Sequence, residues 1–305
     1  MIKSGIKLAY NKFARRTRQY SETMLLLLGK HMSAHVSSMP PNTDFRKIGF
    51  KVFSQWDEDG IIQYLIHNLP IPNKTFVEFG VENYEESNTR FLLMNDHWQG
   101  FVLDASASHI RYIQTDKIYW QYDLQARCAW ITRENINSLL TESGFDADLG
   151  LMSIDIDGND YWVWDAITVV RPRIVIIEYN SVFGLQPISI PYRPNFDRTA
   201  AHHSTLYFGC SLGALNHLAR RKGYRLVGSN ICGHNAFFVR SDIAGSFREL
   251  ELQEAYVPSK FRESRDENGQ LTYVRGRDRV RLIEHLPVVN VVTGEIGSLG
   301  ELCQL

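Results

Sequence analysis

The stretch YRLVGSNICGHNAFFVR (residues 224–240) decides the fold of this chain. It holds two runs rich in aromatic and branched apolar residues, 224–229 and 235–240, and each is typical of a β-strand. Only the five residues NICGH separate them. A parallel crossover needs about a dozen residues or more. The two strands must therefore pair antiparallel, as a hairpin.

Upstream of this hairpin, short apolar runs alternate with segments of helical spacing. Strands are predicted at 75–80, 100–104, 118–123, 149–157 and 173–180. Strands separated by helices at this spacing indicate βαβ units and a doubly wound parallel sheet. Together with the hairpin, they predict an α/β fold with a mostly parallel seven-stranded sheet that ends in an antiparallel pair.

Composition narrows the class of protein. The chain has 305 residues, 44% of them hydrophobic and 22% charged, which is ordinary for a globular protein. A net charge of -1 gives no reason to expect a nucleic-acid partner. Four scattered cysteines without a CxxC pair predict free thiols in a reducing compartment, so we expect a cytoplasmic protein.

Three parts are expected along the chain. Residues 1–45 form a helical arm and a linker, residues 46–245 the main domain, and residues 246–305 a C-terminal extension. The first twenty residues carry six Lys or Arg among apolar residues. Such an arm can lie on the inner membrane as a peripheral contact. A solvated helix that packs on its own domain is the simpler interpretation.

In an open α/β sheet, ligands bind at the carboxyl ends of the strands. The first predicted strand ends at Glu78 and Gly80, and Gly80 allows a ligand to approach the backbone closely. Asn83 and Tyr84 stand where a dinucleotide-binding loop has its second glycine, which disfavours NAD.

The next strand ends are also acidic. Asp104 ends the second predicted strand, where an acid accepts hydrogen bonds from ribose hydroxyls or else caps the next helix. Asp123 ends the third, where it is placed to reach the amino group of a base. Gln55 precedes a predicted helix and is a candidate for the wall of the same cleft.

Acids cluster at the ends of the last two parallel strands. Asp155 and Asp157 share a face of the fourth strand, as Glu178 and Asn180 do on the fifth. If these strands are neighbours, four oxygen donors meet in a site for a hard cation. The alternative is that the aspartates only accept hydrogen bonds from loop amides. Asp160 is expected to cap the following helix.

A general base is predicted in the loop before the helix expected at 212–223. His202 and His203 lie there, and imidazole titrates near neutral pH. Asp157 is a third candidate for taking a proton. Loop histidines without any role remain the alternative.

These residues resemble the class I S-adenosylmethionine-dependent methyltransferases, and among them the FkbM-type and related sugar O-methyltransferases. The resemblance covers about residues 50–240. It rests on the stretches FSQWDEDGII, FVEFGVENYEESNTRFLL, GFVLD, LMSIDIDGNDYWVW and IVIIEYNSVFG. It implies a Rossmann-like fold and S-adenosylmethionine as the cofactor.

The resemblance also implies roles for the site residues. Glu78 and Gly80 would flank the methionine moiety, Asp104 would hold the ribose, and Asp155 would lie near the sulfonium. The further expected cofactor contacts are Gln55, Asn83 and Asp123. In metal-dependent O-methyltransferases, acids and an amide at the places of Asp155, Glu178 and Asn180 bind Mg²⁺, so Mg²⁺ or Mn²⁺ stays open as a second cofactor, with Asp157 as a fourth ligand.

Three functions are weighed. The first is an O-methyltransferase that acts on a sugar hydroxyl of a glycan or a secondary metabolite, with or without a divalent cation. The second is a glycosyltransferase in which the DID of residues 155–157 binds the metal of a nucleotide sugar. The third is a non-catalytic cofactor-fold module that binds a partner protein.

Overall fold

The structure of the protein, a computed structural model, describes residues 2–303. Within the first helix, the side chains of residues 2–16, 18 and 19 lie outside this description. They include the basic side chains of the predicted membrane-binding arm.

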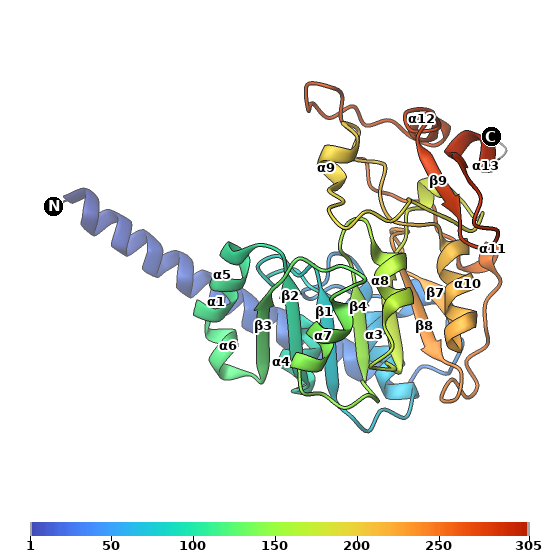
Figure 1. The fold of residues 1–305 in the computed structure, drawn as a ribbon. Helices are drawn as coiled ribbons and strands as arrows, with labels where there is room; N and C mark the ends of the chain where they lie inside the picture. Colours follow the sequence, from blue (N-terminus) through green and yellow to red (C-terminus); the bar gives the residue numbers. More distant parts are fainter. Residues whose placement is uncertain (1, 304–305) are drawn as a thin grey trace.

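A seven-stranded sheet forms the centre of the molecule, in the order β3-β2-β1-β4-β5-β8-β7 (Figure 1). All neighbours are parallel except at β8, which pairs antiparallel with both β5 and β7. This confirms the predicted α/β fold and the terminal hairpin. The strands are β1 (Thr75–Phe79), β2 (Gln99–Asp104), β3 (Leu124–Cys128), β4 (Leu151–Ile154), β5 (Ile174–Glu178), β7 (Tyr224–Ser229) and β8 (Asn235–Arg240).

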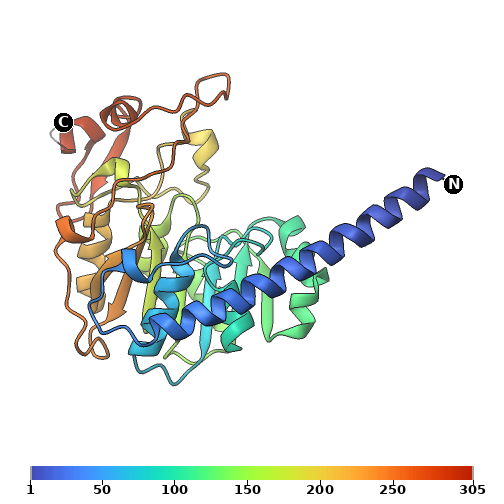
Figure 2. The same cartoon turned by 180° about the vertical axis from the view of Figure 1, so that it is seen from behind.

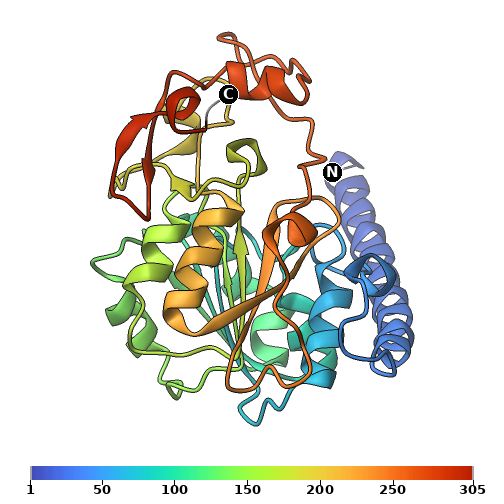
Figure 3. The same cartoon turned by 90° about the vertical axis from the view of Figure 1, so that its right-hand side faces the viewer.

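Helices cover both faces of the sheet, because successive strand residues point to opposite sides. Phe76 packs in one apolar cluster with the helices of the N-terminal half, whereas Val77 packs in the other. Figure 3 shows the two helical layers on either side of the sheet. The first layer holds α1 (Ile2–Val36), α2 (Phe45–Ile48), α3 (Glu58–Asn68), α4 (Arg90–Asp96), α5 (Ala107–Thr115) and α6 (Lys117–Gln121). The second holds α7 (Ile136–Glu142), α8 (Asp160–Ala166), α10 (Leu212–Lys222) and α11 (Leu252–Ala255).

The third predicted strand is wrong. Residues 117–121 form helix α6, capped by the Asp116 carboxylate, which accepts a hydrogen bond from the Ile118 amide. The strand follows at Leu124–Cys128, and of its residues only Leu124 is buried. An edge strand with one buried residue lacks the apolar alternation by which strands are recognised.

A cap of two chain segments, residues 181–209 and 259–303, lies over one edge of the sheet (Figure 1). A third apolar cluster holds the two segments together, with Phe208 from the first and Ile283 from the second. The cap contains a three-stranded antiparallel sheet in the order β10-β9-β6. Its elements are η1 (Ser181–Phe183), β6 (Ile188–Ser189), α9 (Arg198–Ala201), α12 (Arg277–Arg281), β9 (Pro287–Asn290), β10 (Ile296–Ser298) and α13 (Leu299–Cys303).

Helix α1 runs along α3 and α4 and then projects beyond the domain (Figure 2). Its contact with the domain includes a buried ion pair between Glu22 and Arg90. At Gly29 a Cβ atom would lie 2.6 Å from a methyl group of Val52, so the close approach requires glycine. Among the described residues, we find no helix with the length and apolar character needed to cross a membrane.

Candidate functional site

A cavity of about 650 Å³ opens at the carboxyl edge of the sheet, between the strand ends and the cap. Both the sheet and the cap contribute side chains to its wall. From the sheet side come Gln55, Glu78, Gly80, Asp104, Ala129, Trp130, Ile131, Asp155, Asp157, Glu178, His234 and Asn235, and from the cap come Phe196, Arg198, Thr205, Phe208, Phe261 and Arg279.

Glu78 organises the turn that follows β1. Its buried carboxylate accepts hydrogen bonds from the backbone amides of Asn88 and Thr89 and from the hydroxyls of Ser87 and Thr89. Burial raises its pKa, and the hydrogen bond from Ser87 counteracts part of that rise. The residue therefore shapes the cavity wall through the loop that it holds.

Gly80 has a φ of +71°, and a Cβ atom there would lie 1.7 Å from the carbonyl oxygen of Asp155. Only glycine lets the ends of β1 and β4 approach this closely. The close contact brings the Asp155 segment beside the first turn. Gly80 thus allows the turn after β1 and the Asp155 segment to line one cavity.

Asp104 lies at the end of β2 in the cavity wall. Its carboxylate accepts hydrogen bonds from the amides of Glu82 and Ser106, at 2.8 and 2.7 Å, and faces the His109 ring at 3.2 Å. The alternative that Asp104 caps the next helix directly is wrong, because Ser106 is the N-cap of α5. The carboxylate instead ties together the two loops that border the cavity.

Two predicted cofactor contacts are not among the residues that line the cavity. Asp123 precedes β3, so it lies at the amino end of that strand and accepts a hydrogen bond from Gln99. Asn83 accepts a hydrogen bond from the Glu85 amide and is not part of the cavity wall described here. Residues 129–131, which follow the true β3, line the cavity in their place, and Gln55 lines it as predicted.

Three acids meet at the ends of β4 and β5. Carboxylate oxygens of Asp155, Asp157 and Glu178 lie within 4.8 Å of one another. Asp155 directly follows β4, whereas Asp157 lies beyond the strand, with a φ of +54° and a largely exposed side chain. The expectation that both aspartates extend the strand is therefore wrong, although a turn still brings them together.

The environment makes the carboxyls of Asp155 and Glu178 weak acids. Burial, followed by the charges of Asp157 and Asp160, holds the pKa of Asp155 well above its usual range. Burial and the charges of Asp155 and Asp157 do the same to the pKa of Glu178. The Oε2 atom of Glu178 has no hydrogen-bond partner among the described residues. A buried acceptor without a partner is costly, and it marks a place for a ligand group.

Arg198 of the cap supplies the cation nearest to this cluster. Its Nη1 lies 2.5 Å from the Asp157 carboxylate, and its Nε donates to the Thr205 carbonyl. The guanidinium also stacks on Phe208, 3.8 Å from the ring centre. The positive charge of Arg198 lowers the pKa of both Asp155 and Glu178, although burial outweighs it.

Asn180 is engaged elsewhere. Its amide donates to the carbonyls of Leu206 and Phe208, and its oxygen accepts from the Val182 amide. It lines the cavity but holds the first segment of the cap in place. The amide oxygen of Asn180 therefore already has a hydrogen-bond partner and is not a free fourth ligand oxygen beside the acids.

Asp160 has a different structural role from the predicted one. Asn159 occupies the N-cap position of α8. The Asp160 carboxylate accepts hydrogen bonds from the amides of Ile156 and Gly158 instead. Burial raises its pKa to about 6. It holds the turn on which Asp155 and Asp157 sit.

The predicted histidines are not part of the described cavity wall. The Nδ1 of His202 contacts the Ser204 hydroxyl at 2.8 Å, and its ring packs against His203 and His285 in the cap. Burial and the neighbouring rings of His203 and His285 lower the pKa of His202. The histidine at the cavity is His234, which the sequence interpretation missed.

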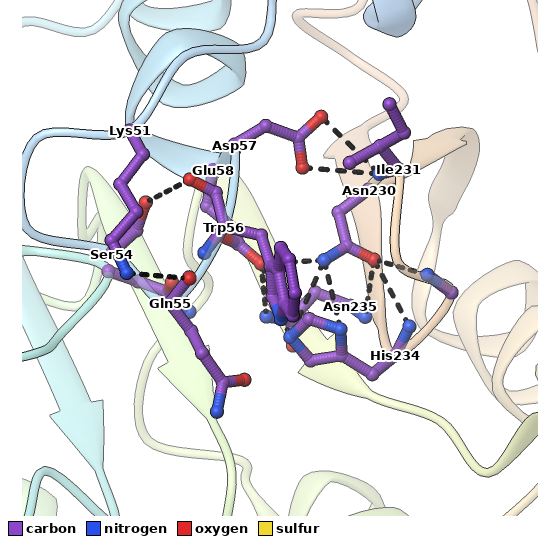
Figure 4. A network of polar contacts seen from close by, with 12 residues as sticks. Lys51, Ser54, Gln55, Trp56, Asp57, Glu58, Asn230, Ile231, His234 and Asn235 are labelled. Carbon is purple, nitrogen blue, oxygen red and sulfur yellow. Dashed lines mark hydrogen bonds and ion pairs between the residues drawn. The ribbon is translucent and has the colours of Figure 1, made fainter. Parts of the chain in front are cut away.

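His234 belongs to a buried network between the start of α3 and the β7–β8 turn (Figure 4). The Glu58 carboxylate accepts hydrogen bonds from Asn230 and Asn235 and pairs with His234 at 3.3 Å. Burial alone would raise the pKa of Glu58, but the His234 ring and the Asn235 amide lower it to about 2. The signal in the sequence was the polar NICGHN turn between two apolar strands.

Known proteins give limited comparisons. No protein-family model matches the sequence, and no curated protein matches it significantly. The structure is similar to a solved S-adenosylmethionine-dependent methyltransferase from Clostridium acetobutylicum, at 8% identity and a TM-score of 0.39 over 65% of this chain and 92% of that one. It is also similar to the N-terminal domain of EvdMO1 with SAH bound, at 10% identity and a TM-score of 0.39, over 69% of this chain and 93% of that one. An O-methyltransferase from Bacillus cereus in complex with SAH is similar at 13% identity and a TM-score of 0.32, over 53% of this chain and 68% of that one.

Proposed function

We propose that this chain is an S-adenosylmethionine-dependent O-methyltransferase that acts on a sugar hydroxyl of a glycan or a secondary metabolite. One observation carries the proposal: a single cavity joins two chemically different ends. Around Glu78, Gly80 and Asp104 it offers a glycine turn and carboxylates. Around Asp155 and Glu178 it offers weakly acidic carboxyls.

The first end suits a nucleoside cofactor. Asp104 ends β2, where an acid accepts hydrogen bonds from ribose hydroxyls. Trp130 and Ile131 add apolar surface after β3, where an adenine ring would lie. No second glycine follows Gly80 to receive a pyrophosphate, which favours a cofactor without one.

The second end suits a sugar acceptor. Phe196, Phe208 and Phe261 present aromatic surface from the cap. Sugars commonly pack a C–H face on such rings while their hydroxyls bind charged groups. Arg198, Asp157 and Glu178 supply those groups in the same wall.

The proposed reaction is an in-line displacement. The acceptor hydroxyl oxygen attacks the sulfonium methyl carbon, the carbon–sulfur bond breaks, and S-adenosylhomocysteine leaves. The proton of the hydroxyl passes to Glu178. One oxygen of this carboxyl has no hydrogen-bond partner among the described residues, and burial raises its pKa, which makes its carboxylate a stronger base than an ordinary glutamate.

A divalent cation fits the donor set. Asp155, Asp157 and Glu178 offer carboxylate oxygens, which Mg²⁺ and Mn²⁺ prefer, and the unpartnered Glu178 oxygen is available for one. These three residues would hold the ion, Arg198 would have to release Asp157, and Glu178 would then be a ligand and not the base. Such an ion would lower the pKa of a bound hydroxyl.

Calorimetry with S-adenosylhomocysteine tests the cofactor. Binding is expected, and Asp104→Asn should weaken it by about tenfold or more, because hydrogen bonds to charged groups are worth roughly 1.5–3 kcal/mol. Asp123→Asn is the matched control, since it lies at the opposite edge of the sheet and should change nothing.

A thermal-shift series then separates the alternatives. S-adenosylmethionine should raise the melting temperature, whereas UDP with Mn²⁺ should not. The reverse pattern would identify a nucleotide-sugar enzyme instead. Transfer of a labelled methyl group into a polysaccharide fraction would identify the acceptor class, and loss of that transfer in Glu178→Gln would support the base.

A further inference from the structure

Helix α1 carries an exposed apolar face that its own domain does not cover. Met24, Leu27 and Leu28 are 58%, 59% and 60% exposed, and Tyr20 is 73% exposed. Residues 20, 24, 27 and 28 follow the spacing of one helix face, with Leu25 and Met32 on its flank. A contiguous exposed apolar patch of this kind marks an interaction surface.

The opposite face of the helix fixes its orientation on the domain. Glu22 pairs with both Arg90 and Lys117, and Ser33 hydrogen-bonds to Gln63. Val36 is fully buried in the same contact. Packing on the domain therefore uses residues 22, 29, 33 and 36 and leaves the apolar face turned outward.

Charge indicates what covers this face. Residues 1–20 carry six Lys or Arg and no acid, so the remaining 285 residues carry a net charge of -7. The helix thus places a strongly basic segment directly before an outward apolar face. Two copies paired in parallel through this face would bring equal charges together, whereas an anionic surface complements them.

We propose that α1 binds the surface of a membrane that contains anionic phospholipids, with Met24, Leu27 and Leu28 inserted among the acyl chains. The helix lies in the plane of the interface and does not span the bilayer. It is one uninterrupted helix of 35 residues that projects beyond the domain, so both segments can contact one flat surface (Figure 2). Each basic residue near such a surface adds about fivefold in affinity.

Co-sedimentation with lipid vesicles tests this proposal on the full chain. The chain should bind vesicles of phosphatidylcholine with phosphatidylglycerol and bind pure phosphatidylcholine far more weakly, and high salt should reduce binding. Met24→Ser with Leu27→Ser and Leu28→Ser should lower the affinity by about tenfold or more, because these substitutions remove most of the apolar surface that would enter the acyl region.

Two double arginine substitutions, one in the helix and one in the cap, test the contribution of charge. Arg15→Gln with Arg16→Gln should weaken binding by roughly 25-fold at about fivefold for each charge. Arg275→Gln with Arg277→Gln removes the same charge from an exposed part of the cap and should have little effect. Equal melting temperatures for all variants show that each still folds.

Two results would overturn the proposal. One is an equal affinity for neutral and anionic vesicles, or no binding to either. The other is a dimer in analytical ultracentrifugation that the triple serine variant dissociates, without vesicle binding by the wild type, which would assign the face to a second copy. Neither result bears on the proposed methyl transfer, since vesicle binding needs no cofactor.

Discussion

Glu78 and Glu178 occupy equivalent places and have opposite surroundings. Glu78 lies near the end of β1 and Glu178 ends β5, and both carboxylates are buried in the wall of one cavity. Two amides and two hydroxyls donate to Glu78. By contrast, one oxygen of Glu178 has no hydrogen-bond partner among the described residues, and two aspartates crowd it.

This difference shows how a structural carboxylate at a strand end can be distinguished from one that is placed to bind a ligand. A buried carboxylate whose acceptor sites are filled stabilises the loop that fills them. A buried carboxylate that faces other acids and an empty volume costs free energy, and a ligand that binds there recovers it. Burial and a raised pKa are common to both residues, so the donors around each carboxylate distinguish them.

The largest effect is expected for Glu78→Gln. A glutamine amide would face two backbone amides and two hydroxyls that need an acceptor. We expect a loss of about 3 kcal/mol in the free energy of unfolding, measured with urea at neutral pH. Glu82→Gln, in the same loop but exposed, should stay within about 0.5 kcal/mol. Equal effects of the two substitutions would show that the hydrogen bonds to Glu78 do not stabilise the loop.

Arg198→Gln should have the next largest effect. It removes the cation beside Asp157 and leaves three acids facing one another. We expect a loss of about 2 kcal/mol, because Asp155 and Glu178 lose the charge that offsets their repulsion and Phe208 loses its stacking partner. Arg198→Lys keeps the charge and should lose about half as much, since it forfeits the stacking on Phe208. If lysine were as damaging as glutamine, packing rather than charge would explain the role of Arg198.

Glu178→Gln should act in the opposite direction to Glu78→Gln. Removing this charge relieves repulsion with Asp155 and Asp157. The free energy of unfolding at neutral pH should rise, because a buried carboxylate beside two aspartates destabilises the folded state. A clear loss of stability would show that Glu178 is a structural residue like Glu78. The unfolding curve in urea decides between the two.

The smallest effect is a slope with pH. Because the pKa values of Asp155 and Glu178 are raised in the folded protein, it binds more protons than the unfolded chain above about pH 4. Stability should therefore fall as the pH rises through these raised values, by less than about 1.4 kcal/mol per group and pH unit. Glu178→Gln should flatten this fall.

The acid side of the same curve has a different origin. Since the pKa of Glu58 is lowered to about 2, its contribution to stability is present above about pH 4 and is lost as the pH falls toward 2. Glu58→Gln should reduce this acid limb, which Glu22 and Asp148 with their lowered pKa values also share, and should leave the alkaline slope unchanged. Chemical denaturation of wild type and both variants across the pH range checks the two limbs separately. An unchanged curve in both variants would contradict the assignment.

The strand ends could be predicted because apolar runs of strands buried on both faces are unmistakable. This pattern predicts β1, β2, β4 and β5. Three of these strands carry Glu78, Asp104 and Glu178, and β4 leads directly into Asp155. β3 was missed, since an edge strand needs few buried residues and the aromatic run before it resembles a strand. Asp123 was consequently assigned to the wrong edge of the sheet.

The cap could not be predicted from local patterns. Its two segments lie on either side of the hairpin in sequence and meet only through tertiary packing. Arg198 contacts Asp157, which lies 41 residues earlier in the sequence. Glu58 pairs with His234, although the two residues lie near opposite ends of the main domain in the sequence. For the same reason His202 and His203, which lie beside Arg198 in sequence, pack among cap residues and not in the described cavity wall.

By itself, the sequence determined the doubly wound sheet, its antiparallel hairpin and the set of acids at the strand ends, because hydrophobic periodicity and loop length are local properties. Only the tertiary structure decided which of these acids is hydrogen-bonded and which is not, because this depends on how each loop folds back on its strand end, as residues 87–89 do on Glu78. It also decided which face of α1 is covered by the domain, and so left the face of Met24, Leu27 and Leu28 exposed.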